Sequence, residues 1–260
     1  MRIGVKGVRT LLERAVCMAD DWLFPERTAC LCCDGALGED EQDGLCPACA
    51  AALEEAFARQ DAAQRAGGEV AAPGLAYVYA AYPYEGQAKR LIVRLKFGHV
   101  RAAAVPLARA MAMLPCGEED VIVPVPTTRS RLRERGFNQA EVLSRHLGQT
   151  WGMRVLPALV RRDGHAAQST LGARQRRENL RGCMCAVEDV LGRRVLLVDD
   201  VYTTGSTAME AARALLEGGA ASVGVLTAAR AMAPQGAKGE ALFVPSGKKR
   251  RLFDDIRGEL

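Results

Sequence analysis

Residues 195–207 read VLLVDDVYTTGST and carry the strongest structural signal in the chain. Four consecutive apolar residues indicate a buried strand of a parallel sheet. Asp199 and Asp200 follow at its carboxyl end, which is where open α/β sheets bind their ligands. The loop 203–207 then supplies hydroxyl groups and a glycine before a helix predicted over 206–217. This strand, acid pair and loop predict an α/β fold with a ligand site at the strand end.

The segments around this stretch extend the same pattern. Strands are predicted for VIVPVP (121–126) and SVGVLTAA (222–229), and a helix for 138–150. RVLPALV (154–160) and CMCAV (183–187) are also expected to be strands. Because strands alternate with helices, crossover connections and a mainly parallel sheet follow.

The loop chemistry suits a sugar phosphate. Backbone N–H groups at a helix N-terminus bind phosphate, and hydroxyl groups add further donors. The loop residues are Thr203, Thr204, Gly205, Ser206 and Thr207. Carboxylates repel phosphate but bind neighbouring ribose hydroxyls and a magnesium ion. The stretch therefore fits a pentose 5-phosphate, and the alternative is an ordinary helix start after a strand that carries two Asp.

The same residues resemble the fingerprint of the type I phosphoribosyltransferases. The resemblance implies that Asp199 and Asp200 hold the ribose hydroxyls of phosphoribosyl pyrophosphate, with Mg²⁺, and that 203–207 surround its 5-phosphate. In that family, the loop after another strand holds the pyrophosphate. Carried over, the candidates are Thr127, Thr128 and Arg129, although a plain edge strand ending in prolines is the alternative.

Three further segments resemble one branch of that superfamily, the ComF family associated with DNA uptake in natural competence. They are LFPERTACLCC (23–33), RLRERGFNQA (131–140) and QSTLGARQRRENLRG (168–182). Twelve arginines against four acids lie between 129 and 181. Among them, the side chains of Arg131, Arg133, Arg135, Arg174 and Arg176 are candidates to clamp a pyrophosphate or to follow a nucleic-acid backbone. A solvated charged helix face is the bland alternative for each.

Paired cysteines near the start predict a metal module. Cys30 and Cys33 form one Cys-x-x-Cys knuckle, and Cys46 and Cys49 form a second. Four thiolates on two tight turns suit structural zinc, with no open position for catalysis. Cys32 can replace a neighbour as ligand, and free thiols or a redox pair are the alternative to zinc. We also expect the C-terminal domain to survive metal loss, on the assumption that its core is separate.

Length and composition limit the possible number of domains, the partners and the location of the protein. The 260 residues, 49% of them hydrophobic, suffice for one ordinary domain and a small module, and the net charge of +4 names no partner. No transmembrane or secretory segment is predicted, so a cytoplasmic protein without membrane insertion is expected. We expect an N-terminal helix and zinc module over 1–70, a phosphoribosyltransferase-type domain over 75–232 and an extension over 233–260. Tyrosines at 77, 79, 82 and 84, beside a basic helix, fit either sheet packing or a stacking platform for single strands.

Three functions remain open at this point. The resemblance favours a competence protein that binds phosphoribosyl pyrophosphate and contacts single-stranded DNA and a competence helicase-type partner. The alternatives are a conventional nucleobase salvage phosphoribosyltransferase and a ligand-sensing regulator without activity. Transfer would be a magnesium-dependent displacement of pyrophosphate from C1 of the ribose, helped mainly by positioning and charge stabilisation. No residues in the sequence plainly recognise an acceptor base.

Overall fold

The computed structural model describes residues 29–38, 42–67, 75–116, 118–161 and 182–231. Its centre is a sheet with the strand order β1-β6-β5-β2, and all of its neighbouring strands run parallel. The strands are β1 (Tyr77–Pro83), β2 (Val121–Pro124), β5 (Arg194–Tyr202) and β6 (Ser222–Arg230). The predicted α/β class with a mainly parallel sheet is confirmed.

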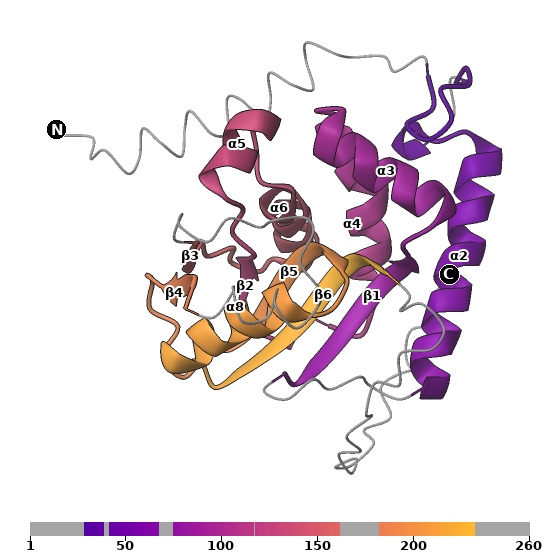
Figure 1. The fold of residues 1–260 in the computed structure, drawn as a ribbon. Helices are drawn as coiled ribbons and strands as arrows, with labels where there is room; N and C mark the ends of the chain where they lie inside the picture. Colours follow the sequence, from indigo (N-terminus) through magenta and orange to yellow (C-terminus); the bar gives the residue numbers. More distant parts are fainter. Residues whose placement is uncertain (1–28, 39–41, 68–74, 117, 162–181, 232–260) are drawn as a thin grey trace, which may run out of the picture.

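Helices cover both faces of this sheet (Figure 1). They are α2 (Pro47–Gly67), α3 (Gly86–Phe97), α4 (Ala104–Ala112), α5 (Arg129–Arg135), α6 (Gln139–Trp151) and α8 (Ser206–Glu217), with short 3-10 turns η1 (Gln42–Gly44) and η2 (Arg101–Ala103). Side chains of β5 alternate between two hydrophobic clusters. Leu196 and Val198 face the cluster of α3, α4 and α6, whereas Val195 and Leu197 face that of α8. This strand is therefore buried on both faces, as its apolar run predicted.

The strands predicted at 154–160 and 183–187 are present in shortened form, but they lie outside the main sheet. β3 (Leu159–Arg161) and β4 (Met184–Ala186) form a separate antiparallel pair. Val155 makes only an isolated bridge to Ile122 on β2. Pro157 has no N–H to continue that pairing, so the chain leaves the edge of the main sheet there.

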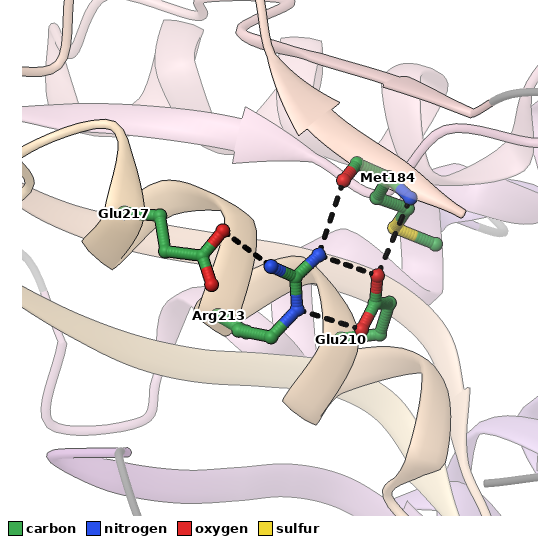
Figure 2. Close-up of polar contacts among 4 residues, drawn as sticks. All are labelled: Met184, Glu210, Arg213 and Glu217. Carbon is green, nitrogen blue, oxygen red and sulfur yellow. Dashed lines mark hydrogen bonds and ion pairs between the residues drawn. The ribbon is translucent and has the colours of Figure 1, made fainter. Parts of the chain in front are cut away.

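An ion pair between buried Glu210 and partly exposed Arg213 connects this small sheet to α8 (Figure 2). The Glu210 carboxylate accepts hydrogen bonds from Arg213, at 2.8 and 3.0 Å, and from the backbone N–H of Met184. The Arg213 guanidinium also donates to the Met184 carbonyl oxygen and pairs with Glu217. Burial alone would raise the pKa of Glu210, but the hydrogen bonds from Arg213 and Met184 outweigh burial and lower it.

The cysteine module is continuous with the α/β domain. Leu31, Leu45 and Leu53 belong to the same hydrophobic cluster as α3 and α4. Asp34 pairs with Arg94 of α3, and Asp43 pairs with Arg109 of α4. The expectation that the domain has a separate core is therefore wrong. Long helix α2 lies along the outer side of β1 (Figure 1), where Gln64 Oε1 accepts the Ala80 N–H at 2.8 Å.

The four tyrosines lie mainly in packed positions. Tyr77 and Tyr79 have ring centroids 4.9 Å apart, and Tyr82 is buried with its ring edge against Phe57 of α2. Gly224 on β6 leaves the space that the Tyr77 ring fills. Packing across the sheet is thus the better description for Tyr77 and Tyr82.

Candidate functional site

The acid pair lies at the carboxyl end of β5. Asp199 is partly buried, and Asp200 is buried with 9% of its surface exposed. The Asp199 Oδ1 atom accepts the Asp200 N–H at 2.8 Å, which holds the Asp199 carboxylate against the backbone of the next residue. Desolvation and the adjacent charge of Asp200 raise the pKa of Asp199 to about 7.

The hydroxyl loop leads directly from this acid pair into α8. Gly205 adopts a left-handed conformation with φ of 74° and caps the helix without a side-chain hydrogen bond. Thr204 Oγ1 and Ser206 Oγ lie 2.8 Å apart, and Thr203 and Thr204 are exposed. The first turn of α8 thus begins beside two hydroxyl groups, and the Ser206 N–H donates to Thr204 Oγ1 at 3.5 Å. This arrangement suits a phosphate dianion.

The second predicted loop starts at the neighbouring strand end. Pro124 of β2 is in register with Val198 of β5, so residues 127–129 follow the same edge of the sheet as the acid pair. Thr128 caps α5, because its Oγ1 accepts the Arg131 N–H at 3.3 Å. Thr127 is partly buried and Arg129 is exposed. A pyrophosphate role for these three residues stays a prediction.

The structure divides the predicted arginines into different environments. Arg131 and Arg133 are exposed on α5, whereas Arg135, the last residue of that helix, is buried with 9% exposure. Arg135 lies over the Phe97 ring at 5.1 Å and donates to Gln139 at 3.1 Å. It therefore lines the interior beside the acid pair, not an outer basic surface. Arg174 and Arg176 lie outside the described residues.

One site residue was missed by the sequence analysis, which placed it only in a basic helix beside the tyrosines. Lys96, in the last turn of α3, pairs with Asp200 at 2.8 Å between Nζ and Oδ1. No local motif marks Lys96, because its partner comes from a strand far along the chain. The ammonium group already occupies a position where a cation meets Asp200, so the carboxylate pair fits Mg²⁺ by charge and ligand type.

The cysteine cluster has the geometry of a metal centre. The Sγ atoms of Cys30, Cys33, Cys46 and Cys49 all lie within 4.8 Å of one another. The Cys32 thiol donates to the Gln87 carbonyl oxygen at 3.5 Å and also contacts the Cys49 thiol, so it borders the group of four. The arrangement could hold a metal such as zinc, with protein ligands at all four tetrahedral positions.

Backbone hydrogen bonds prepare this cluster for a cation. Burial opposes ionisation of the Cys30 thiol, but N–H donation from Cys46 and Cys32 outweighs burial and lowers its pKa to about 6. Burial and the neighbouring thiols raise the pKa of Cys49. A bound cation would favour the thiolate form of Cys49, which burial and the neighbouring thiols oppose.

Comparisons with known proteins agree with this geometry. The model of the phosphoribosyl transferase domain family matches residues 117–256. The DNA utilization protein YhgH of Escherichia coli O157:H7 is 38% identical over 52% of this chain and 63% of its own length. Competence protein F of Haemophilus influenzae is 38% identical over 43% of this chain and 51% of its own. The chain thus spans less than two thirds of these relatives.

Among solved structures, a glutamine phosphoribosylpyrophosphate amidotransferase from B. subtilis, complexed with ADP and GMP, is 19% identical. The match has a TM-score of 0.38 and covers 53% of this chain and 30% of that chain. Among the described residues, no helix has the length and apolar character that a membrane span requires.

Proposed function

Because the chain belongs to the phosphoribosyl transferase domain family, within its ComF group, we propose that it binds phosphoribosyl pyrophosphate with Mg²⁺ and serves DNA uptake or processing during competence. One observation carries the ligand proposal. The Asp199–Asp200 pair near the end of β5 comes a short loop before the N-terminus of α8, where the N-cap residue Gly205 has no side chain to cap the helix. This arrangement supports a site in which the acid pair binds ribose hydroxyls and the following loop binds a phosphate.

Different residues of the site contact different parts of the ligand. Asp199 and Asp200 accept hydrogen bonds from the ribose hydroxyls and share the magnesium ion, which neutralises charge on the pyrophosphate. Residues 203–207 donate to the 5-phosphate through hydroxyl and backbone N–H groups. The Thr127–Arg129 loop is the candidate for the pyrophosphate end. If transfer occurs, these groups act by positioning the ribose and by stabilising negative charge on the departing pyrophosphate.

Exposed arginines support the nucleic-acid part of the proposal. Arg131 and Arg133 lie on the outer surface of α5, next to the sheet edge that carries the acid pair. Single-stranded DNA contacted through its phosphates is the partner that this surface suits best. A salvage transferase and a ligand-sensing regulator remain the alternatives for the acid-pair site.

Isothermal titration calorimetry tests the ligand proposal. Changing Asp199→Asn and Asp200→Asn together should reduce the affinity for Mg²⁺-phosphoribosyl pyrophosphate by at least about 100-fold, since hydrogen bonds to charged groups contribute about 1.5–3 kcal/mol each. Asp120→Asn is the matched control, because Asp120 pairs with Arg194 at the opposite end of β5. Equal affinity in the double variant and the wild type would refute the site assignment.

A second measurement separates the functions. Labelled phosphoribosyl pyrophosphate, offered with a panel of purine, pyrimidine and amide acceptors, reports transfer directly. Product with one acceptor would favour the salvage enzyme. Ligand binding without any product favours a competence protein or a regulator, and DNA binding then distinguishes between these two.

A further inference from the structure

The Lys96–Asp200 ion pair is largely shielded from water. The two side chains are 18% and 12% exposed, and their charged atoms lie 2.8 Å apart. An ion pair in such a place is held firmly, because neither partner regains full hydration when the other leaves. Lys96 is therefore the counter-ion of the acid pair in the ligand-free protein.

A second buried cation lies beside this pair. Arg135 is 9% exposed, and its Nε atom has no hydrogen-bond partner among the described residues; the same holds for Nε2 of Gln139, which is 2% exposed. Arg135 is within electrostatic range of Asp200. His99 Nδ1 lies 3.0 Å from the Arg135 carbonyl oxygen and so ties the turn after α3 to the end of α5. Arg135 thus brings a second positive charge into the range of Asp200, together with an Nε donor that has no partner among the described residues.

Charge balance in this region depends on what occupies the acid pair. Lys96 of α3 pairs with Asp200 and also acts on Asp199 through its charge. The charge of Arg135 acts on Asp200, and that of Arg161 of β3 acts on Asp199. When a divalent cation binds Asp200, the Lys96 ammonium loses its partner inside a poorly hydrated site. A buried unpaired charge is strongly unfavourable. An anion placed beside Lys96 and Arg135 removes that penalty.

We propose that Lys96 exchanges partners during binding, from Asp200 in the free protein to the pyrophosphate of the ligand once a magnesium ion holds the carboxylate. This inference rests on the proposed function and adds Lys96, with Arg135 beside it, as positioning residues for the anionic end of the ligand. Lysine suits such an exchange because its ammonium is a compact charge on a flexible stem.

The exchange makes the metal and the anion bind cooperatively. Metal alone must displace Lys96 without any new partner for it, whereas metal and pyrophosphate together leave every charge paired. By linkage, each ligand then raises the affinity for the other by the same factor. Removing the lysine charge should therefore change metal binding and ligand binding in opposite directions.

Lys96→Met in the full-length chain tests this prediction, because methionine keeps much of the side-chain volume. Mn²⁺ alone, followed by electron paramagnetic resonance, should bind the variant about fivefold more tightly than the wild type. Mg²⁺-phosphoribosyl pyrophosphate, followed by calorimetry, should bind it about tenfold more weakly. Lys96→Arg should restore ligand affinity in part. Lys89→Met is the control on the same helix, since its ammonium lies 5.8 Å from the Tyr84 ring centroid.

The two binding measurements distinguish the exchange from a damaged fold and from failure of the proposed function. Opposite shifts for Mn²⁺ and for the phosphorylated ligand support the exchange, and a damaged fold cannot tighten metal binding. Shifts in the same direction, or no shift in either measurement, overturn it. Failure of the wild type to bind phosphoribosyl pyrophosphate would refute the proposed function and this inference together. Tight binding by both the wild type and Lys96→Met would refute the inference alone.

Discussion

At the scale of single residues, Gly205 shows how closely the phosphate loop is fitted. It has a φ of 74°, and a Cβ atom at this position would collide with the Tyr202 ring. Tyr202 is itself buried at the end of β5. The loop therefore follows the strand so tightly that only glycine fits the turn.

We predict that Gly205→Ala destabilises the protein and weakens ligand binding. The left-handed backbone alone costs about 1 kcal/mol for alanine, and the collision with Tyr202 adds to it. Gly152→Ala is the matched control, because Gly152 has φ of 65° and open space around its Cβ position. Urea unfolding should show a larger loss of unfolding free energy for Gly205→Ala. Equal losses would mean that Tyr202 imposes no constraint.

The exposed and the buried arginines of α5 should differ in how much they contribute to nucleic-acid binding. Changing Arg131→Ala and Arg133→Ala together should weaken binding of a labelled single strand in fluorescence anisotropy. The log–log salt slope should shrink by about 0.7 for each DNA phosphate that the variant no longer neutralises. Arg135→Ala should leave that slope unchanged, because its guanidinium is buried over Phe97. A slope that the double change leaves untouched would remove this helix from the DNA surface.

Sequence reasoning succeeded for residues whose role is local. Asp199 and Asp200 directly follow an apolar run within β5, so their place near the carboxyl end of the strand could be predicted from neighbours alone. Lys96 could not be found this way, because its contact with Asp200 depends on the packing of α3 against the sheet. Arg135 looked equivalent to Arg131 and Arg133 in the sequence. The packing of the short helix α5 distinguishes them, because it buries Arg135 and leaves the other two exposed.

At the scale of elements, the Glu210–Arg213 pair decides where the small β3–β4 sheet sits. The Glu210 side chain is 4% exposed and that of Arg213 is 35% exposed. Together they bind both backbone groups of Met184, at the start of β4. The sequence predicted α8 and a strand near 184, but not this connection, since neither segment alone shows the pairing.

Arg213→Met should destabilise the protein by about 2 kcal/mol. Loss of one partner from a fully buried pair costs about 3–5 kcal/mol, and the partial exposure of Arg213 reduces this figure. Arg145→Met is the control, because its pair with Glu141 is 42% exposed on both sides and should contribute below about 0.5 kcal/mol. Chemical denaturation at pH 7 compares the two variants. Equal effects would show that the hydrogen bonds to Met184 add nothing.

The same pair predicts the direction of a pH effect. The folded protein lowers the pKa of Glu210, so its contribution is fully present above the unfolded value of about 4.3. It is lost as the pH falls through the lower, folded value. Glu210→Gln should therefore flatten the decline of stability between about pH 5 and pH 3. Unfolding free energies across this range, with the wild type as reference, measure the difference.

At the scale of the whole molecule, the cysteine module and the α/β domain form one packed structure. Leu31, Cys49 and Leu53 share a cluster with Leu91 and Leu107 of the helices on the sheet. Sequence alone suggested two units, because acidic and cysteine-rich residues precede the sheet. That boundary is visible in composition, whereas the shared core depends on three-dimensional packing.

We predict that one zinc ion per chain copurifies and that its removal destabilises the entire protein. Metal analysis gives the stoichiometry, and scanning calorimetry with and without a chelator gives the melting temperature. Because the cores are joined, both parts should melt together at a lower temperature. Cys46→Ser with Cys49→Ser should reproduce this effect, and Cys185→Ser, remote from the cluster, should not. An unchanged main transition without metal would contradict the coupling.

Helix α2 covers the free edge of β1, and this cover bears on self-association of the protein. β1 is an edge strand of the sheet. On the free side of this strand, the Ala80 N–H donates a hydrogen bond to Gln64 of α2. Such a strand, if uncovered, offers unpaired backbone groups to any passing chain. Since α2 begins at Pro47, within the second cysteine knuckle, we expect release of a metal bound there to loosen the cover of this edge. We therefore predict that the metal-free protein self-associates through the exposed edge of β1.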